Sequence, residues 1–273
     1  MATEPDIQGG AFQRTAYPRL PLRAGGRIGL TAWVLVLLVG IAGVAAALTG
    51  VAAGVLPRRF TAAQQQQITA WEFGKRWRTW PAGKIFPGSV RYQLPASALA
   101  DVDGLTLTAR RVGISPQAGC ATTTDPAAAS VLARHGCQAI LRATYADATG
   151  SYVVTIGIAV LPAPGQAAAA AGQLAGGHGA RGFRPGVRAL LFPHTVAARF
   201  RDGQRQLTSS FAAGSYVVFY AVGYADGRPR AQVADNPYAD SEMTSVAGGV
   251  ARSIAASFGA PPAAPRCPGA PGC

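Results

Sequence analysis

The feature that most constrains this chain is an uncharged, mostly apolar run at residues 28–56, IGLTAWVLVLLVGIAGVAAALTGVAAGVL. About 20 such residues suffice to cross a bilayer as a helix. A cleavable signal peptide is the alternative, because the small residues of VAAALTG offer cleavage sites. Secretory apolar regions, however, span only about 7–15 residues, and this run is longer. We therefore predict an uncleaved signal anchor, with a transmembrane helix at residues 28–56.

The cysteines indicate on which side of that segment the rest of the chain lies. Arginines flank the apolar run on both sides, so the positive-inside rule gives no clear orientation. An even set of cysteines confined to one side indicates disulfides and an oxidising compartment. All four follow the run: Cys120, Cys137, Cys267 and Cys273. We predict a single-pass protein of the cell membrane, with a cytoplasmic N-terminus and an extracytoplasmic C-terminal domain.

Four cysteines allow three pairings, and pairing of nearest neighbours is the simplest. Cys120 and Cys137 bracket a predicted short helix, and Cys267 and Cys273 would close the loop CPGAPGC. A metal site made of Cys120, His135 and Cys137 is the alternative, but the spacing lacks the paired C-x2-C pattern of zinc sites. We therefore predict structural disulfides and assign no metal ligand and no cofactor.

Composition and periodicity divide the chain into segments. Residues 1–27 mix Gly, Pro, Arg and polar residues without periodicity, and the last residues are rich in Pro, Gly and Cys. The predicted segments are a disordered cytoplasmic tail (1–27), a transmembrane helix (28–56), a membrane-proximal helix (57–81), an extracytoplasmic α+β domain (82–259) and a Pro/Gly/Cys tail (260–273).

The end of the membrane-proximal helix and the residues after it form WEFGKRWRTWPAGKIFP, residues 71–87, which holds three of the four tryptophans and both lysines. A capping-box pattern, Thr61 with Gln64, predicts where the helix begins, and Pro81 predicts where it ends. Phe73, Trp77 and Trp80 recur at i, i+4 and i+7 and so share one face. Nucleic-acid stacking or a place at the lipid interface are alternative roles. We expect the aromatic face to pack on the domain, with the charges turned outward. The predicted cluster comprises Trp71, Phe73, Lys75, Arg76, Trp77, Arg78 and Trp80.

Alternating patterns after Pro81 predict an α+β fold, a mainly antiparallel sheet with flanking helices. The run 151–161 is apolar on both faces, which predicts a central strand covered on both sides. Helices are predicted at 125–135 and 241–258, with Asp125 and Asp240 as N-caps, and in the alanine-rich run from residue 167. The predicted strands are 89–94, 105–114, 137–146, 151–161, 188–192, 196–200, 205–211 and 215–224.

No sequence motif in the chain indicates catalysis. The G-x-S-x-G, H-E-x-x-H and P-loop patterns do not occur, and GHGARG at 177–182 matches G-x-G-x-x-G without a preceding strand. His135, His178 and His194 have no acidic or nucleophilic residue at a telling spacing. We assign no catalytic residue, although a triad brought together by the fold would leave no such pattern.

Several stretches carry a resemblance to known proteins: RWRTWPAGKIFPGSVRYQ, RRVGISPQAGC, HGCQAILRATYADATGSYVVTIGIAVLP and SYVVFYAVGYADGRPR. Over most of residues 70–230 the chain resembles a group of actinobacterial single-pass membrane proteins of unassigned function. The resemblance implies an anchor and an extracytoplasmic domain, and it brings no catalytic residue. The α+β pattern with disulfides is also similar in architecture to the extracytoplasmic sensor domains of actinobacterial kinases and lipoproteins.

The function expected from these features is a membrane-anchored binding or assembly domain of the bacterial cell envelope, without enzymatic activity. Its expected partners are membrane lipid through residues 28–56 and another envelope protein or an anionic wall polymer. The net charge of +13 is dispersed and does not form a nucleic-acid footprint. Two alternatives stay open: an extracytoplasmic hydrolase with a scattered triad, and an inverted topology with a cytoplasmic basic domain that binds nucleic acid.

Overall fold

The computed structural model describes residues 29–55, 61–93, 105–176, 183–232 and 237–260. The chain divides into two units, Met1–Arg59 and Phe60–Cys273. The predicted disulfide between Cys267 and Cys273 and the predicted tails lie outside the described residues, as does His178.

In the first unit the apolar run forms helix α1 (Leu30–Val55). Its described side chains are apolar and, from Trp33 to Ala47, exposed; Trp33, Leu37 and Ile41 are 62%, 60% and 61% exposed. Among the residues that the structure describes, no helix combines the length and the apolar character needed to cross a membrane.

The second unit is built on a curved antiparallel sheet, a half-barrel whose six described strands follow the order β1-β2-β3-β4-β6-β5. The α+β class with an antiparallel sheet and flanking helices is thereby confirmed. The strands are β1 (Ser89–Gln93), β2 (Thr106–Ala118), β3 (Ala139–Ala146), β4 (Tyr152–Val160), β5 (Leu207–Ala213) and β6 (Tyr216–Tyr224).

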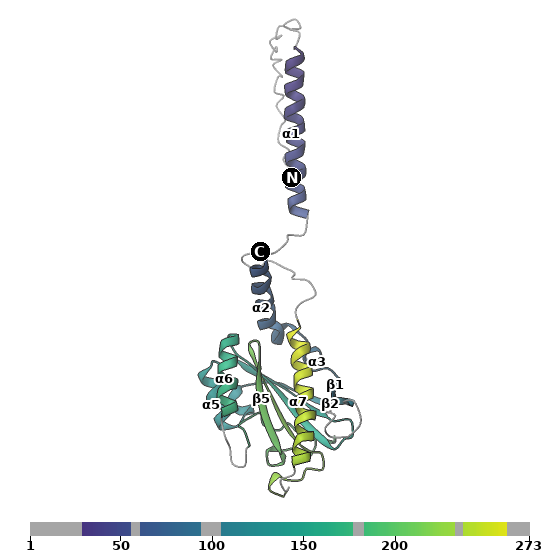
Figure 1. Cartoon of the computed structure of the whole chain (residues 1–273), viewed down its shortest axis with the longest axis vertical. Helices are drawn as coiled ribbons and strands as arrows, with labels where there is room; N and C mark the ends of the chain where they lie inside the picture. The colour runs from purple at the N-terminus through teal and green to yellow at the C-terminus, as the bar shows by residue number, and fades with distance from the viewer. Residues whose placement is uncertain (1–28, 56–60, 94–104, 177–182, 233–236, 261–273) are drawn as a thin grey trace, which may run out of the picture. The chain divides into compact units, whose positions relative to one another are not determined.

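Helices cover both faces of this sheet. On one face lie α2 (Ala62–Thr79), α3 (Ala82–Ile85) and α7 (Pro237–Gly259). On the other lie α5 (Pro126–Arg134) and α6 (Pro164–Gly176); in Figure 1 both are to the left of β5, and α7 is to its right. The remaining short helices are α4 (Cys120–Thr123), η3 (Asp202–Gln204) and η4 (Arg230–Gln232).

Strand β4 lies between the two hydrophobic cores, one on each face of the sheet. All nine of its residues are buried. Ile156 and Ile158 belong to the core under α7, whereas Ala159 packs with α5 and α6. Since side chains alternate between faces along a strand, a run that is apolar throughout needs cover on both sides. The prediction of a central strand at 151–161 is confirmed.

Helices α2 and α5 have the predicted N-cap residues, whereas α7 does not. At α2, Thr61 Oγ1 accepts a hydrogen bond from Gln64 N, and Gln64 Oε1 accepts one from Thr61 N, which is the predicted capping box. Asp125 occupies the N-cap position of α5, but its side chain makes no capping bond. Asp240 lies in the first turn of α7, because this helix begins earlier, at Pro237.

The strands predicted at 188–192 and 196–200 are wrong. This segment crosses the second face of the sheet: Leu190 N donates to Thr155 Oγ1 at 3.0 Å, and Thr144 Oγ1 donates to Leu190 O at 2.7 Å. Ala197 and Phe200 pack with Val153. The apolar residues of this segment therefore cover the face of the sheet instead of forming a strand. The backbone of Leu190 bonds to the side chains of Thr144 on β3 and Thr155 on β4, and not to the backbone of an edge strand.

The structure joins Cys120 and Cys137 in a disulfide, with an S–S distance of 1.99 Å and a Cα–Cα distance of 6.4 Å. The bridge links the start of α4 to the residues before β3, so that α4 and α5 are enclosed in its loop. Cys120 and Cys137 pack against the core formed by α5, α6 and the sheet.

We predict that the double substitution Cys120→Ala and Cys137→Ala lowers the free energy of unfolding by about 3 kcal/mol. The bridge spans a sequence separation of 17 residues, and in the chain-entropy model a loop of this size contributes about that amount. Urea denaturation of the purified second unit would measure the change. An unchanged unfolding midpoint would contradict the prediction.

Candidate functional site

The predicted aromatic face of α2 packs on the domain. Trp77 is 8% exposed and belongs to the core under α7. The Phe73 ring lies 4.9 Å from the ring of Tyr216 and 5.7 Å from that of Phe258, and the Trp80 ring lies 5.8 Å from Phe258. The face thus joins the first helix of the unit to β6 and to the end of α7.

The expectation that all charges of the cluster point outward is wrong for Arg76, which is 2% exposed. Its guanidinium donates to the carbonyl oxygen of Phe258, pairs with Glu72 at 3.3 Å and lies 4.7 Å from the Trp80 ring. Carbonyls at a helix C-terminus lack intrahelical partners and attract cations, so the end of α7 accounts for this burial.

The other charges of the cluster lie over aromatic rings on α2. Lys75 Nζ is 3.9 Å from the centroid of Trp71, and Arg78 is 4.3 Å from that of Trp77. Trp71 is 46% exposed and points away from the core. Of the predicted cluster, the structure therefore brings Phe73, Arg76, Trp77 and Trp80 onto the domain and leaves Trp71, Lys75 and Arg78 on the solvent side.

The turn between β5 and β6 completes this contact. Gly214 has a φ of +56°, and a Cβ there would lie 2.0 Å from Phe73 Cε1. The Tyr216 hydroxyl donates to the carbonyl oxygen of Phe73. Only glycine gives the turn its backbone conformation and leaves room for the Phe73 ring. These contacts fix the position of α2 on the sheet.

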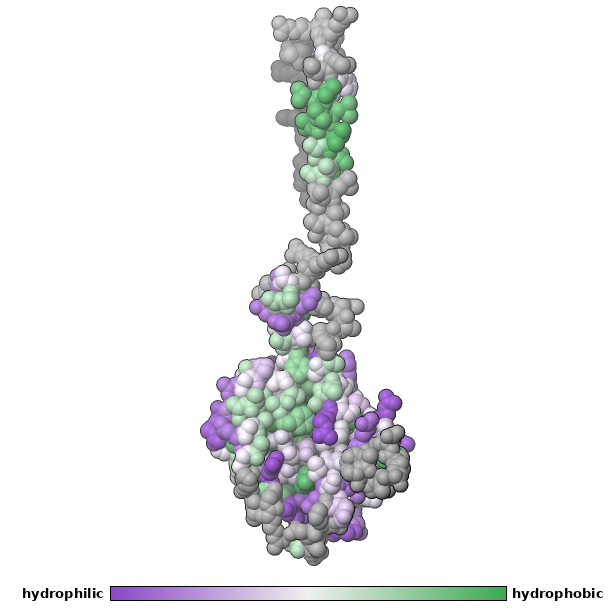
Figure 2. All heavy atoms as spheres, viewed as in Figure 1, coloured by the Kyte–Doolittle hydropathy of each residue, from purple (hydrophilic) through white to green (hydrophobic). Residues whose placement is uncertain are grey.

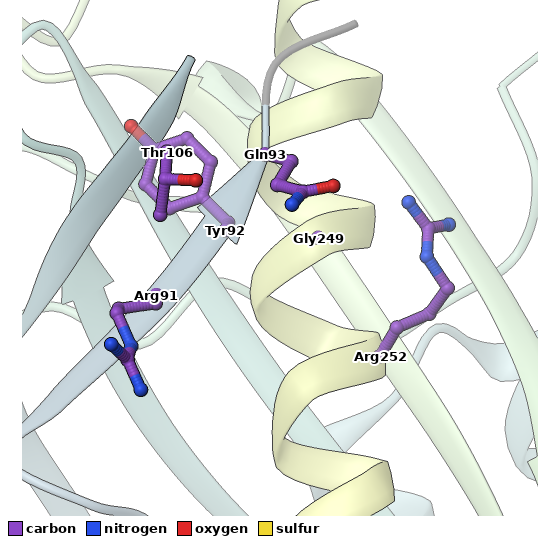
Figure 3. A pocket seen from close by; sticks show the side chains of 6 residues that line it. All are labelled: Arg91, Tyr92, Gln93, Thr106, Gly249 and Arg252. Carbon is purple, nitrogen blue, oxygen red and sulfur yellow. The ribbon is translucent and has the colours of Figure 1, made fainter. Parts of the chain in front are cut away.

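A cleft of about 500 Å³ lies where α7 crosses β1. Gly249 permits the close approach of helix and strand, because a Cβ at this position would lie 2.8 Å from Tyr92 Cβ. In Figure 3, Gln93 and Arg252 lie on either side of Gly249, and Arg91 extends from the strand. The lining residues are Arg91, Tyr92, Gln93, Thr106, Gly249 and Arg252.

The charge of this cleft is positive. Arg91 and Arg252 are exposed, and among the described residues neither forms an ion pair with a carboxylate. Gln93 and Thr106 add neutral hydrogen-bonding groups. The two guanidinium groups extend in opposite directions, Arg91 from β1 and Arg252 from α7 (Figure 3), so they suit separate phosphate or carboxylate groups of one extended anion. The cleft offers binding chemistry and no paired acid and base.

Sequence reasoning missed this cleft because Arg91 and Arg252 are far apart in the chain. A signal was present in Gly248-Gly249, within an otherwise apolar helical face. Glycine in a helix interior is unfavourable by about 1 kcal/mol relative to alanine, so a pair of them indicates a close approach. The sequence pattern did not indicate that the residue in contact with this part of the helix is Tyr92 on β1.

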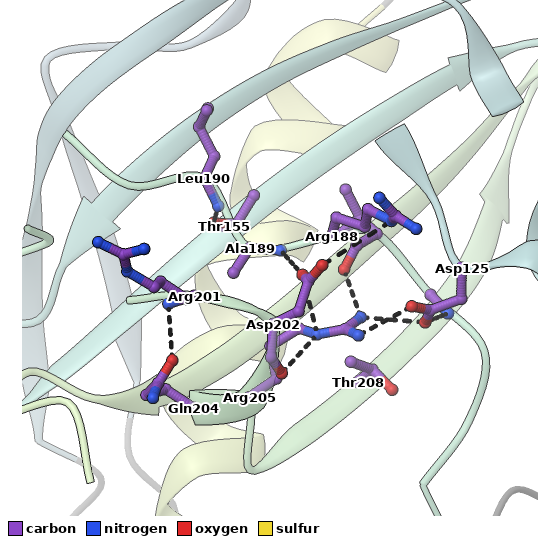
Figure 4. A network of polar contacts seen from close by, with 12 residues as sticks. Asp125, Thr155, Arg188, Ala189, Leu190, Arg201, Asp202, Gln204, Arg205 and Thr208 are labelled. Carbon is purple, nitrogen blue, oxygen red and sulfur yellow. Dashed lines mark hydrogen bonds and ion pairs between the residues drawn. The ribbon is translucent and has the colours of Figure 1, made fainter. Parts of the chain in front are cut away.

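A second polar cluster lies on the opposite face of the sheet (Figure 4). The Arg205 guanidinium, 7% exposed, donates to both carboxylate oxygens of Asp125 at 3.0 and 2.8 Å and to Val187 O at 3.0 Å. Asp125 also accepts from Gly186 N at 2.9 Å, and Asp202 accepts from Ala189 N at 2.9 Å. Each polar group has a partner within the chain, so the cluster holds the segment that crosses the second face.

Tyr152 connects the sheet to the start of α7. Its hydroxyl donates to Glu242 Oε2 at 2.7 Å. Burial, followed by this hydrogen bond and the charge of Glu242, raises the pKa of Tyr152. The tyrosine therefore stays protonated and keeps donating, which is a structural role.

The histidines do not assemble a catalytic site within the described residues. His135 Nδ1 lies 2.8 Å from Gln166 Oε1, and His194 is exposed in a turn with a φ of +59°. Neither forms an ion pair with a carboxylate in the described part of the chain. The same residues contain no group of His, Cys, Asp and Glu suited to a metal ion.

Comparisons of the chain with protein-family models, with curated proteins and with solved structures find no match.

Replacing Trp77 with Ala should lower the free energy of unfolding of the second unit by about 3–5 kcal/mol, because a buried aromatic ring is lost. Trp71→Ala is the matched control: this ring is 46% exposed, so its loss should change stability by about 0.5 kcal/mol or less. Chemical denaturation in detergent measures both. Equal effects of the two substitutions would show that the aromatic face does not support the domain.

Gly214→Ala should destabilise the unit more than Gly150→Ala. Both glycines have positive φ values, +56° and +73°, so either substitution carries backbone strain of about 1–2 kcal/mol. A methyl group at residue 214 also collides with Phe73, whereas at residue 150 it meets open space. Thermal melting of both variants tests this; similar losses would refute the role of the Gly214–Phe73 contact.

Proposed function

We propose that this chain is a membrane-anchored, extracytoplasmic binding domain of a bacterial cell envelope, which acts on its ligand by binding rather than by catalysis. The uncharged run at 28–56 supports the anchor. The Cys120–Cys137 disulfide supports an oxidising compartment for the folded unit. Free thiols at both positions in protein taken directly from cells would contradict that location.

The observation that carries the binding role is the cleft between β1 and α7. Its volume of about 500 Å³ lies within the range of small-ligand sites, about 300–1,000 Å³. Arg91 and Arg252 have no carboxylate partner among the described residues, so an anion would supply the missing counter-charge. The ligand class that fits is an anionic wall polymer, with phosphate or carboxylate groups repeated along a chain.

Charge also supports this ligand. The chain has 25 basic and 12 acidic residues, and a basic surface attracts polyanions over a distance of about 10 Å at moderate salt. General attraction would act at every exposed arginine. A defined site differs in that two particular arginines carry most of the affinity.

The test measures binding of a short polyphosphate and of an oligoglutamate of equal charge to the full chain in detergent. Arg91→Gln together with Arg252→Gln should weaken binding of the preferred anion by about tenfold or more, because charge-assisted hydrogen bonds contribute about 1.5–3 kcal/mol each. The preference between the two probes distinguishes phosphate from carboxylate ligands.

Arg134→Gln on α5 is the control for charge, since this exposed arginine lies on the other face of the sheet. It should change affinity by less than about twofold, the effect expected of a distant exposed charge. If Arg134→Gln weakened binding as much as a single substitution in the cleft, attraction by net charge alone would replace the proposed site.

A further inference from the structure

The two edges of the sheet differ in how they are protected. An edge strand presents unpaired backbone N–H and C=O groups, and proteins blunt such edges with charge, short length or a covering element. Strand β1 has all three: it is five residues long, contains Arg91 and lies under α7. Strand β5, at the other edge, also has a helix packed against it, α6, but it is seven residues long and its sequence, LTSSFAA, has no charged residue and no proline.

The outer side of β5 borders no other described strand. Among the described residues β6 is the strand paired with it, through seven residue pairs from Leu207↔Val222 to Ala213↔Tyr216. Thr208 is buried and Ala212 is exposed, while the other five residues are partly exposed. No described strand pairs with the outer side of these seven residues, so that side can accept another extended segment.

The surface around this edge is apolar. Leu207, Phe211 and Ala213 are partly buried against the core under α7. Figure 2 shows a hydrophobic area on this face, where Figure 1 places β5 between α6 and α7. Partial exposure of three apolar side chains beside free backbone groups distinguishes this edge from an ordinary solvated one.

A groove continues from the end of β5. It has a volume of about 690 Å³ and lies between α2, the β5–β6 turn and the end of α7. Its walls combine Ala, Gly and Phe73 with four polar residues, so apolar side chains fit the part beside Phe73; the polar residues are Gln65, Gln66, Thr69 and Arg76. The lining residues at its β5 end are Ala213 and Gly214, and those at its far end are Ala62, Gly259 and Ala260.

A second copy of this chain fits this surface poorly. Its own β5 could pair with the edge, but its chain turns back at Gly214 and is held before Leu207 by the Arg205–Asp125 pair. It could not extend into the groove. The excess of 25 basic over 12 acidic residues also opposes self-association and favours a partner of opposite net charge.

We propose that β5 binds an extended segment of an acidic partner protein by strand addition, with apolar side chains of that segment entering the groove beside α2. Backbone hydrogen bonds to the outer side of β5 supply affinity. The groove, with Phe73 in its wall, selects apolar side chains. This surface is separate from the cleft at β1, so the inference stands whether or not the cleft binds an anion.

The test uses the full chain in membranes of its native host, with a photo-crosslinking benzoylphenylalanine placed at Ser210 or, in a second protein, at Ala212. These positions share one side of β5, because strand side chains alternate. Mass spectrometry should locate both crosslinks in one segment of one acidic protein, about two residues apart. The same probe at exposed Ala133 on α5 should not capture that segment.

A blocking variant makes the test specific for the edge. Ala212→Lys adds a charge of the kind that protects natural edges, and should reduce crosslinking from Ser210 by about tenfold with an unchanged melting temperature. Ala133→Lys, with the same charge, should leave it unchanged. Crosslinks to a second copy, crosslinks to residues 261–273 of the same chain, or none above the Ala133 control would each overturn the proposal.

Discussion

The pairing of β4 with β6 is the constraint on which the rest of this domain depends. Nine residue pairs, from Tyr152↔Tyr224 to Val160↔Tyr216, join two strands that are almost wholly buried. A strand pair that is apolar on both faces cannot stay in contact with water, so both faces require cover. The covering elements come from different parts of the chain: α2 and α7 on one face, and α5, α6 and the segment that follows them on the other.

Elements whose signal is local could be predicted from the sequence. The capping box at Thr61 and Gln64, the end of α2 before Pro81 and the apolar run at 151–161 each depend on neighbouring residues, and the structure contains each of them. The class of the fold followed from the same alternation. The strands expected at 188–192 and 196–200 failed because an apolar alternation also suits a segment that lies across a sheet.

The candidate sites were less predictable, because each depends on contacts between distant parts of the chain. The burial of Arg76 needs the carbonyl of Phe258, 182 residues further on. The cleft needs Gly249 against Tyr92, and the carboxylate of Asp125, expected to cap α5, instead pairs with Arg205, 80 residues away. In each case the residue type was visible in the sequence but its partner was not.

The contact between Phe73, Arg76 and Phe258 has a mechanical consequence. Helix α2 opens the folded unit and α7 is its last described element, so the chain enters and leaves the unit at the same end, where Ala62 and Ala260 line one groove. A tension applied between these two points would load the aromatic contact and the Arg76–Phe258 hydrogen bond. These contacts would bear the tension before the ladder between β4 and β6, so the two helices could separate while the sheet kept its form.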